Sequence, residues 1–254
     1  MKRGFVIGVL AVLAFGVILV ARLPASWIIP APPAPIACTT VDGSLWNGVC
    51  GGLVYQGRTL GDVRWSLHPL KLLSGRVAAH VVLNRGTGTN QASSAEGDVE
   101  VGFSGKNITA RDLKADAAVD DELRSQLGLD INYLLNLHAD LKLIRVDGKQ
   151  VQEIRGLIEA RDIRERGPKG TQFGGYSVTF PGGPGEQVGK LRDLGGGPLS
   201  VEGTARLTNE PGVEVHGLVA PHAGASPDLL DALRYLGSPD AQGRREFGPI
   251  PYAF

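Results

Sequence analysis

Residues 135–143 read LNLHADLKL, an unbroken alternation of apolar and polar amino acids. Successive side chains of a β-strand point to opposite faces, so this stretch predicts a strand with an apolar side. The leucines on that side are Leu135, Leu137, Leu141 and Leu143. We expect them to form a hydrophobic groove or core; the alternative is that they only pack beneath helices. Asp147-Gly148 then predicts a two-residue hairpin turn into a strand over 149–160.

The same period of two returns along most of the chain from about residue 41. Further strands are predicted at residues 99–103, 176–180, 199–207 and 213–219. The chain has 36 Gly and 16 Pro among 254 residues and only 6% aromatic residues. This composition favours many short strands and turns over a helical bundle. About ten strands joined by short turns predict a mainly β protein whose antiparallel sheet follows the chain order.

Two short helices are expected within this pattern. One is predicted over residues 120–129. The other begins at Ser226-Pro227-Asp228, because serine is a favoured N-cap and proline fits the first helical position. Its apolar stripe consists of Leu229, Leu230, Leu233 and Leu236, and Gly237 ends it. The polar segment 86–97 is predicted to be a loop.

The N-terminus carries an 18-residue uncharged run, GFVIGVLAVLAFGVILVA, at residues 4–21. A helix of this length nearly spans the hydrocarbon core of a bilayer, which is about 30 Å thick. Two cations precede the run, so the positive-inside rule leaves residues 1–3 in the cytoplasm. We expect a single transmembrane anchor over 4–23, with the rest of the chain beyond the membrane. A cleaved signal peptide is the first alternative, and a lipoprotein processed at Cys38 is the second.

Prolines crowd the segment that follows the expected anchor, with five of them in residues 24–37. Such a segment tends to the extended polyproline II conformation and acts as a semi-rigid spacer. The sequence therefore predicts a linker over 24–37 and a β-rich domain over 38–254.

Cys38 and Cys50 are the two cysteines of the chain. On a domain exported to an oxidising compartment they predict a disulfide bond, which would contribute about 3 kcal/mol by closing a short loop. A redox or metal-binding pair is the alternative. It is weaker, because there is no C-x-x-C motif and two cysteines are too few ligands for a structural zinc ion.

The charge balance argues against binding to nucleic acid, because 26 Lys and Arg are matched by 26 Asp and Glu. The catalytic motifs H-E-x-x-H and G-x-S-x-G do not occur. The five histidines are scattered, and His138 is interpreted as a solvated or hydrogen-bonded strand residue. We therefore predict no catalytic residue, no cofactor and no metal, and we expect a protein that is not an enzyme.

Two segments that contain tryptophan are more distinctive. Trp46 lies between turn residues inside the predicted disulfide loop. Residues 60–69 read LGDVRWSLHP and predict a strand that carries Trp65 on its apolar side. We assign Trp65 to the hydrophobic groove or core, as an anchor of the first hairpin.

These segments, taken in order, resemble the type II secretion system protein N family. The motifs that carry the resemblance are GSLWNG at 43–48, LGDVRWSLHP at 60–69, GR at 75–76, DLGGGPL at 193–199, LRYLG at 233–237 and DAQGR at 240–244. The resemblance covers nearly the whole chain. It also includes the layout, with a short N-terminal start, one anchor and a β-rich domain.

The resemblance implies a single-pass inner-membrane protein of a Gram-negative bacterium with a periplasmic domain. It implies a role in the export of folded proteins from the periplasm across the outer membrane. It also implies partners among the other inner-membrane and periplasmic components of that secretion system. The family is similar to the AsmA-like group, which implies an elongated, twisted antiparallel sheet of curved or half-barrel shape.

Two functions stay open at this point. The first is a structural or assembly component of the secretion machine. The second is a periplasmic module in envelope maintenance that binds lipid or another hydrophobic molecule in the groove of a curved sheet.

Overall fold

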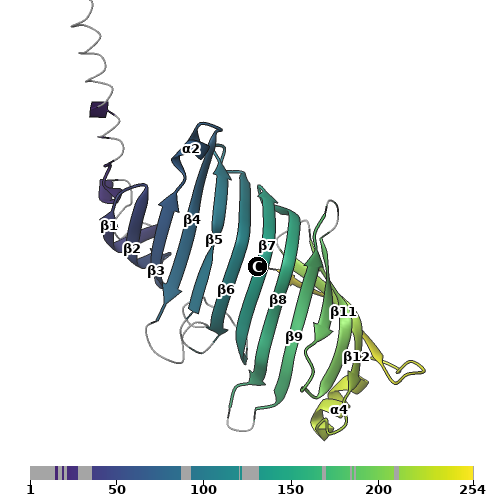
Figure 1. Cartoon of the computed structure of the whole chain (residues 1–254). Helices are drawn as coiled ribbons and strands as arrows, with labels where there is room; N and C mark the ends of the chain where they lie inside the picture. The colour runs from purple at the N-terminus through teal and green to yellow at the C-terminus, as the bar shows by residue number, and fades with distance from the viewer. Residues whose placement is uncertain are drawn as a thin grey trace, which may run out of the picture.

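A computed structural model describes residues 15, 16, 19, 22–27, 36–86, 93–119, 121, 132–167, 170–183, 185, 187–208 and 212–253. Within these residues it contains one antiparallel sheet of thirteen strands, each paired with its neighbours in chain order (Figure 1). The strands are β1 (Ile36–Gly43), β2 (Asn47–Tyr55), β3 (Arg58–Leu67), β4 (Arg76–Arg85), β5 (Ser93–Gly102), β6 (Asn107–Val119), β7 (Tyr133–Asp147), β8 (Gln150–Glu165), β9 (Gln172–Pro181), β10 (Val188–Asp193), β11 (Leu199–Leu207), β12 (Gly212–Pro221) and β13 (Arg245–Ala253). The predicted mainly β, antiparallel meander is confirmed.

The helices in the described part of the chain are short. They are η1 (Ala25–Trp27), α2 (Pro69–Leu72) and α4 (Pro227–Arg234). The predicted start of α4 is confirmed, because the Ser226 hydroxyl accepts a hydrogen bond from the Leu229 amide at 3.3 Å. The single turn α2 was not expected from the sequence. The helix predicted over 120–129 lies outside the described residues, apart from Asp121.

The N-terminal part of the chain joins the sheet earlier than the sequence suggested. Pro24 forms a β-bridge with Ser44, and the Leu45 amide donates to the Leu23 carbonyl at 2.8 Å. Strand β1 then begins at Ile36, inside the segment predicted as a linker. Among the described residues, no helix is both long and apolar enough to cross a membrane. The anchor predicted over 4–23 falls mostly on residues that are not described.

Two local details differ from the sequence interpretation. Asp147 pairs with Gln150, so the hairpin turn consists of Gly148 and Lys149 and lies one residue later than predicted. Gly148 has φ +62°, a conformation that favours glycine. Residues 93–97, predicted as part of a loop, are the start of β5, where each of them pairs with a residue of β4.

Bulges bend the middle of the sheet. Lys142 of β7 has no partner in β8, since Leu141 pairs with Gly156 and Leu143 pairs with Arg155. Strand β6 also carries an extra residue, at Asp112, whose φ is +47°. A bulge strengthens the twist of a strand and bends it. The sheet therefore curves, and its C-terminal strands turn behind β7–β9 in Figure 1.

One face of the sheet carries a compact ionic cluster around Glu100. The Glu100 carboxylate accepts ion pairs from Lys71 at 2.8 Å, Arg111 at 3.2 Å and Arg76 at 3.3 Å. The Lys71 hydrogen bond, assisted by Arg111, lowers the pKa of Glu100 from 4.5 to about 2. Since Lys71 belongs to α2 and Glu100 to β5, the cluster ties α2 to the sheet.

Replacement of Glu100 should destabilise the fold in a pH-dependent way. The folded-state pKa lies below the unfolded value, so the stabilisation is full above about pH 4.5 and is lost as the pH falls towards 2. We expect E100Q to lower the free energy of unfolding by about 1–2 kcal/mol at pH 7 and by less at pH 3. Urea unfolding of the detergent-solubilised chain, followed by tryptophan fluorescence, measures both values.

The control for this comparison is D231N, which removes an exposed carboxylate whose ion pair with Arg234 lies on the surface of α4. It should leave the free energy of unfolding unchanged at both pH values. An E100Q effect that is equally large at pH 7 and pH 3 would contradict the ionic role of Glu100.

Candidate functional site

A row of apolar and glycine residues crosses the whole sheet. In antiparallel strands, directly paired residues place their side chains on the same face. We traced one such row through the directly paired residues of adjacent strands. It contains one residue from each of the thirteen strands and no polar side chain. This central apolar row consists of Val41, Cys50, Val63, Leu83, Ala95, Ala115, Ala139, Ile158, Val178, Leu191, Gly203, Gly217 and Phe247. We call the face that carries it the apolar face.

The core lies on the apolar face at the centre of the sheet. Ala139, Leu141, Ile154 and Phe180 form a buried cluster. Leu207 of β11 also packs against this cluster, although β11 is separated from β9 by β10. Phe180 makes this contact across the intervening strand possible, because its ring lies over Gly189 of β10, which has no side chain.

Aromatic side chains cover glycines on this face. Trp65 lies over Gly48 of the adjacent strand, where an added Cβ would come within 2.2 Å of the indole. The Trp65 Nε1–H donates to the Leu45 carbonyl at 2.8 Å, so the half-buried indole has a polar partner. Phe180 similarly lies over Gly189. The structure thus places Trp65 at the N-terminal end of the apolar face, where it holds β2, β3 and the β1–β2 turn together.

The predicted leucines do not all share this face. Leu141 is buried in the central cluster and pairs with Leu113. Leu143 instead pairs with Arg111, whose guanidinium reaches Glu100 on the opposite face. The next residue, Ile144, is the one that packs against the central cluster on the apolar face. The expectation for Leu143 is therefore wrong, because the bulge at Lys142 shifts the alternation by one residue.

The other two leucines lie toward the opposite end of β7. Leu137 pairs with Ala117 and Ala160 on the apolar face. Leu135 pairs with Val119 and lines a cavity of about 790 Å³, together with Leu194 of the β10–β11 connection. Polar groups line the same cavity, among them the Glu159–Arg161 ion pair. The structure thus gives the four predicted leucines different places: Leu141 is in the buried core, Leu137 is on the apolar face, Leu135 lines the cavity and Leu143 is on the other face.

Helix α4 covers only the C-terminal end of the apolar face. Its Leu233 packs with Val201 and Val219 of β11 and β12. Helix α2 is tied to Glu100 on the opposite face. Neither of these described helices lies over the leucines of β7. Within the described residues, no large side chain is fully buried, so these helices form no complete second layer over the apolar face.

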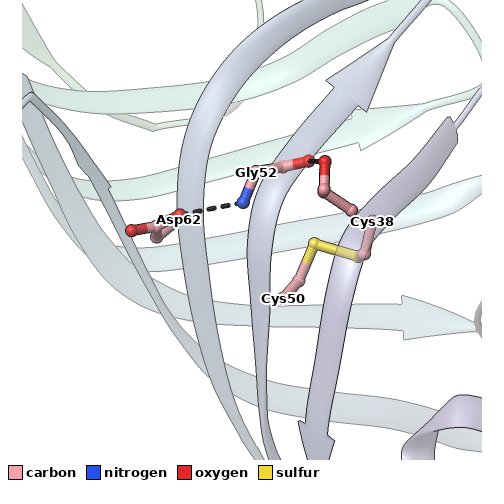
Figure 2. The surroundings of a disulfide bond; sticks show 5 residues. Cys38, Cys50, Gly52 and Asp62 are labelled. Carbon is pink, nitrogen blue, oxygen red and sulfur yellow. Dashed lines mark hydrogen bonds between the residues drawn. A yellow bond between two sulfur atoms is a disulfide. The ribbon is translucent and has the colours of Figure 1, made fainter.

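Cys38 and Cys50 form a disulfide bond between β1 and β2 (Figure 2). Next to it, the Gly52 amide donates to Asp62 at 2.8 Å and the Gly52 carbonyl accepts from Thr39 at 3.2 Å. Gly52 has φ +59° at a bulge, so these side chains satisfy backbone groups that the ladder leaves out. The bond fixes the edge strand β1, which supports the structural interpretation of the two cysteines.

Two histidines outside the ionic cluster form simple cross-strand pairs with aspartates. His138 contacts Asp116 at 2.7 Å, and His80 contacts Asp98 at 3.0 Å. Across the part of the chain that the structure describes, no group of three His, Cys, Asp or Glu side chains is placed to hold a metal ion. What this arrangement offers chemically is a long apolar surface flanked by polar edges.

The fold and this face define the class of single-layered, open antiparallel β-sheet proteins. The family model "Type II secretion system (T2SS), protein N" matches residues 34–248. The chain therefore belongs to the type II secretion system protein N family, which makes it a component of that system. The family assignment from the sequence motifs is confirmed.

Two relatives carry the same description. The type II secretion system protein N of Vibrio cholerae serotype O1 (strain ATCC 39315 / El Tor Inaba N16961) is 28% identical over 255 residues, which cover 97% of this chain and 98% of the relative. The type II secretion system protein N of Aeromonas hydrophila is 32% identical over 108 residues, 41% of this chain and 40% of the relative. No solved structure matches the chain significantly.

The bulge at Lys142 predicts that alanine substitutions of two leucines in β7 change the free energy of unfolding by different amounts. L141A should lower the free energy of unfolding by about 2–4 kcal/mol, because it leaves a cavity in the central cluster. L143A should cost less than about 1 kcal/mol, because this side chain lies opposite two arginines outside the cluster. Urea unfolding of the two variants measures the difference, and equal costs would show that the alternation continues unbroken.

Proposed function

We propose that the protein is a non-catalytic inner-membrane component of the type II secretion system that takes part in exporting folded periplasmic proteins across the outer membrane. The family match over residues 34–248 carries this proposal. The apolar run at 4–21 adds the membrane anchor, with residues 1–3 in the cytoplasm and the sheet in the periplasm. Its partners are other inner-membrane and periplasmic components of the system.

The structural roles of the polar residues support a non-catalytic function. Glu100, whose pKa departs most clearly from its usual value, serves to tie α2 to the sheet. The histidines that pair with carboxylates do so across adjacent strands, as His138 does with Asp116. A disulfide at the edge strand is consistent with a periplasmic domain, because such bonds persist in oxidising compartments.

The first experiment compares the extracellular proteins of a clean deletion strain with those of the complemented strain. We expect secreted enzymes to accumulate in the periplasm of the deletion strain and to return to the medium on complementation. An epitope-tagged chain should fractionate with the inner membrane and resist extraction with alkaline carbonate. Unchanged secretion would contradict a role in export, whereas a chain recovered in the soluble periplasm would contradict the anchor alone.

A second function is favoured by the central apolar row: the binding of lipid or another hydrophobic molecule during envelope maintenance. This row crosses all thirteen strands, and α4 covers it only near β11 and β12. Contiguous apolar surfaces of this length are unusual on a protein without a partner for them. Leu83 of β4 is a suitable probe position, since it lies in the row away from both buried clusters.

The test places the photoreactive residue p-benzoylphenylalanine at Leu83 or at Asn84 in cells labelled with radioactive phosphate. The two positions are adjacent in β4 and therefore point to opposite faces. We expect phospholipid adducts from Leu83 and few or none from the exposed Asn84. The absence of adducts at Leu83, with the chain at its normal level in the membrane fraction, would rule out lipid on this part of the apolar face.

A further inference from the structure

The chain enters the sheet at one particular rim. In an up-and-down sheet, the connections that follow odd-numbered strands all lie at the same end. The first four are 44–46 after β1, 68–75 after β3, 103–106 after β5 and 148–149 after β7, and we call their end the N-terminal rim. Leu23 and Pro24 bond to the first of these connections. In Figure 1, η1 and α2 lie at this end and α4 lies at the other.

No spacer separates the predicted anchor from this rim. The anchor is expected to end at residue 23, and Leu23 already accepts a backbone hydrogen bond from Leu45. The N-terminal rim must then lie at the membrane surface. Since neighbouring strands are about 4.8 Å apart, the β3–β4 connection lies about 12 Å along the rim from β1. Trp27, which is 74% exposed, is an aromatic residue of the kind enriched at bilayer interfaces.

The rim presents large apolar side chains to solvent. Leu70 and Leu73, in and just after α2, are 80% and 88% exposed. Phe103 in the β5–β6 turn is 67% exposed, and its amide donates to the Gly75 carbonyl at 3.1 Å. The three side chains therefore sit on two connections that are bonded to each other. These three side chains are not part of either buried cluster, so the packing of the sheet does not explain them.

Cations surround these apolar side chains. Lys71 lies in α2 and Arg76 begins β4 shortly after it, and Lys106 and Lys149 lie on the next two connections of the rim. The carboxylates near these connections are Asp42, Asp147 and the buried Glu100, which is ion-paired with Lys71 and Arg76. A cavity of about 420 Å³ opens between the two bonded connections. Its polar lining consists of Ser74, Arg76, Glu100, Ser104, Asn107 and Thr109.

We propose that the N-terminal rim is a second membrane-contact site, in which Leu70, Leu73 and Phe103 enter the bilayer interface beside the anchor. The occupant is an anionic phospholipid surface, whose phosphates meet Arg76, Lys71 and Lys106. A lipid surface fits better than a protein partner, because the chain itself brings the bilayer to this rim. The contact would hold the sheet in one orientation relative to the membrane. This inference rests on the anchor in the proposed function.

The test measures the depth of a spin label in the full-length chain, reconstituted in nanodiscs of phosphatidylcholine and phosphatidylglycerol at a ratio of three to one. One variant is L73C. The matched control is Y235C, which is 93% exposed and follows α4 at the opposite rim. The native cysteines are disulfide-bonded and do not react with the label. A second position, F103C, checks the neighbouring connection.

We expect labels at 73 and 103 to be accessible to oxygen and protected from a water-soluble nickel chelate, and the label at 235 to show the reverse. A chain that stays in the nanodisc with all three labels in water would overturn the rim contact and leave the anchor intact. A chain that does not stay in the nanodisc would overturn both. Labels that are exposed in nanodiscs but protected in native membranes would assign the rim to a protein partner and overturn the lipid contact.

Discussion

The structure depends on one constraint: a sheet of a single layer must keep its apolar face away from water without a second layer to cover it. Every strand is hydrogen-bonded to its neighbours in the chain, so the backbone groups between strands are paired from β1 to β13. The central apolar row then runs from Val41 to Phe247 with nothing polar in it. Curvature is the means by which such a face becomes partly buried.

Bulges and glycines supply that curvature. Asp112 and Lys142 add a residue to each of two adjacent central strands, whereas β5 and β8 on either side have none at that level. Glycines beneath Trp65 and Phe180 let aromatic rings lie flat on the neighbouring strand. The ring of Phe180 over Gly189 also brings the cluster around Leu141 within reach of Leu207 on β11.

The two faces and two ends of the sheet have different properties, and this asymmetry organises the proposed functions. The apolar face offers a long hydrophobic surface, whereas the face with Glu100 fixes α2 through ion pairs. The end that receives the chain carries exposed leucines and lysines, whereas the far end carries α4. An anchored sheet of this kind would present its groove in a defined direction to the other components of a secretion machine.

The sequence by itself determined the antiparallel meander, the start of α4, the disulfide pair and the family. These follow from signals that are local in the chain: alternation of period two, an N-cap, two cysteines and ordered motifs. It could not place Leu143, since LNLHADLKL continues to alternate across a bulge that exists only because β8 pairs around Lys142. Nor could it show that Pro24 joins the sheet, which depends on a bridge to Ser44. The pairing between strands sets which face a side chain occupies and which rim Leu23 and Pro24 join. That pairing was decided only by the tertiary structure.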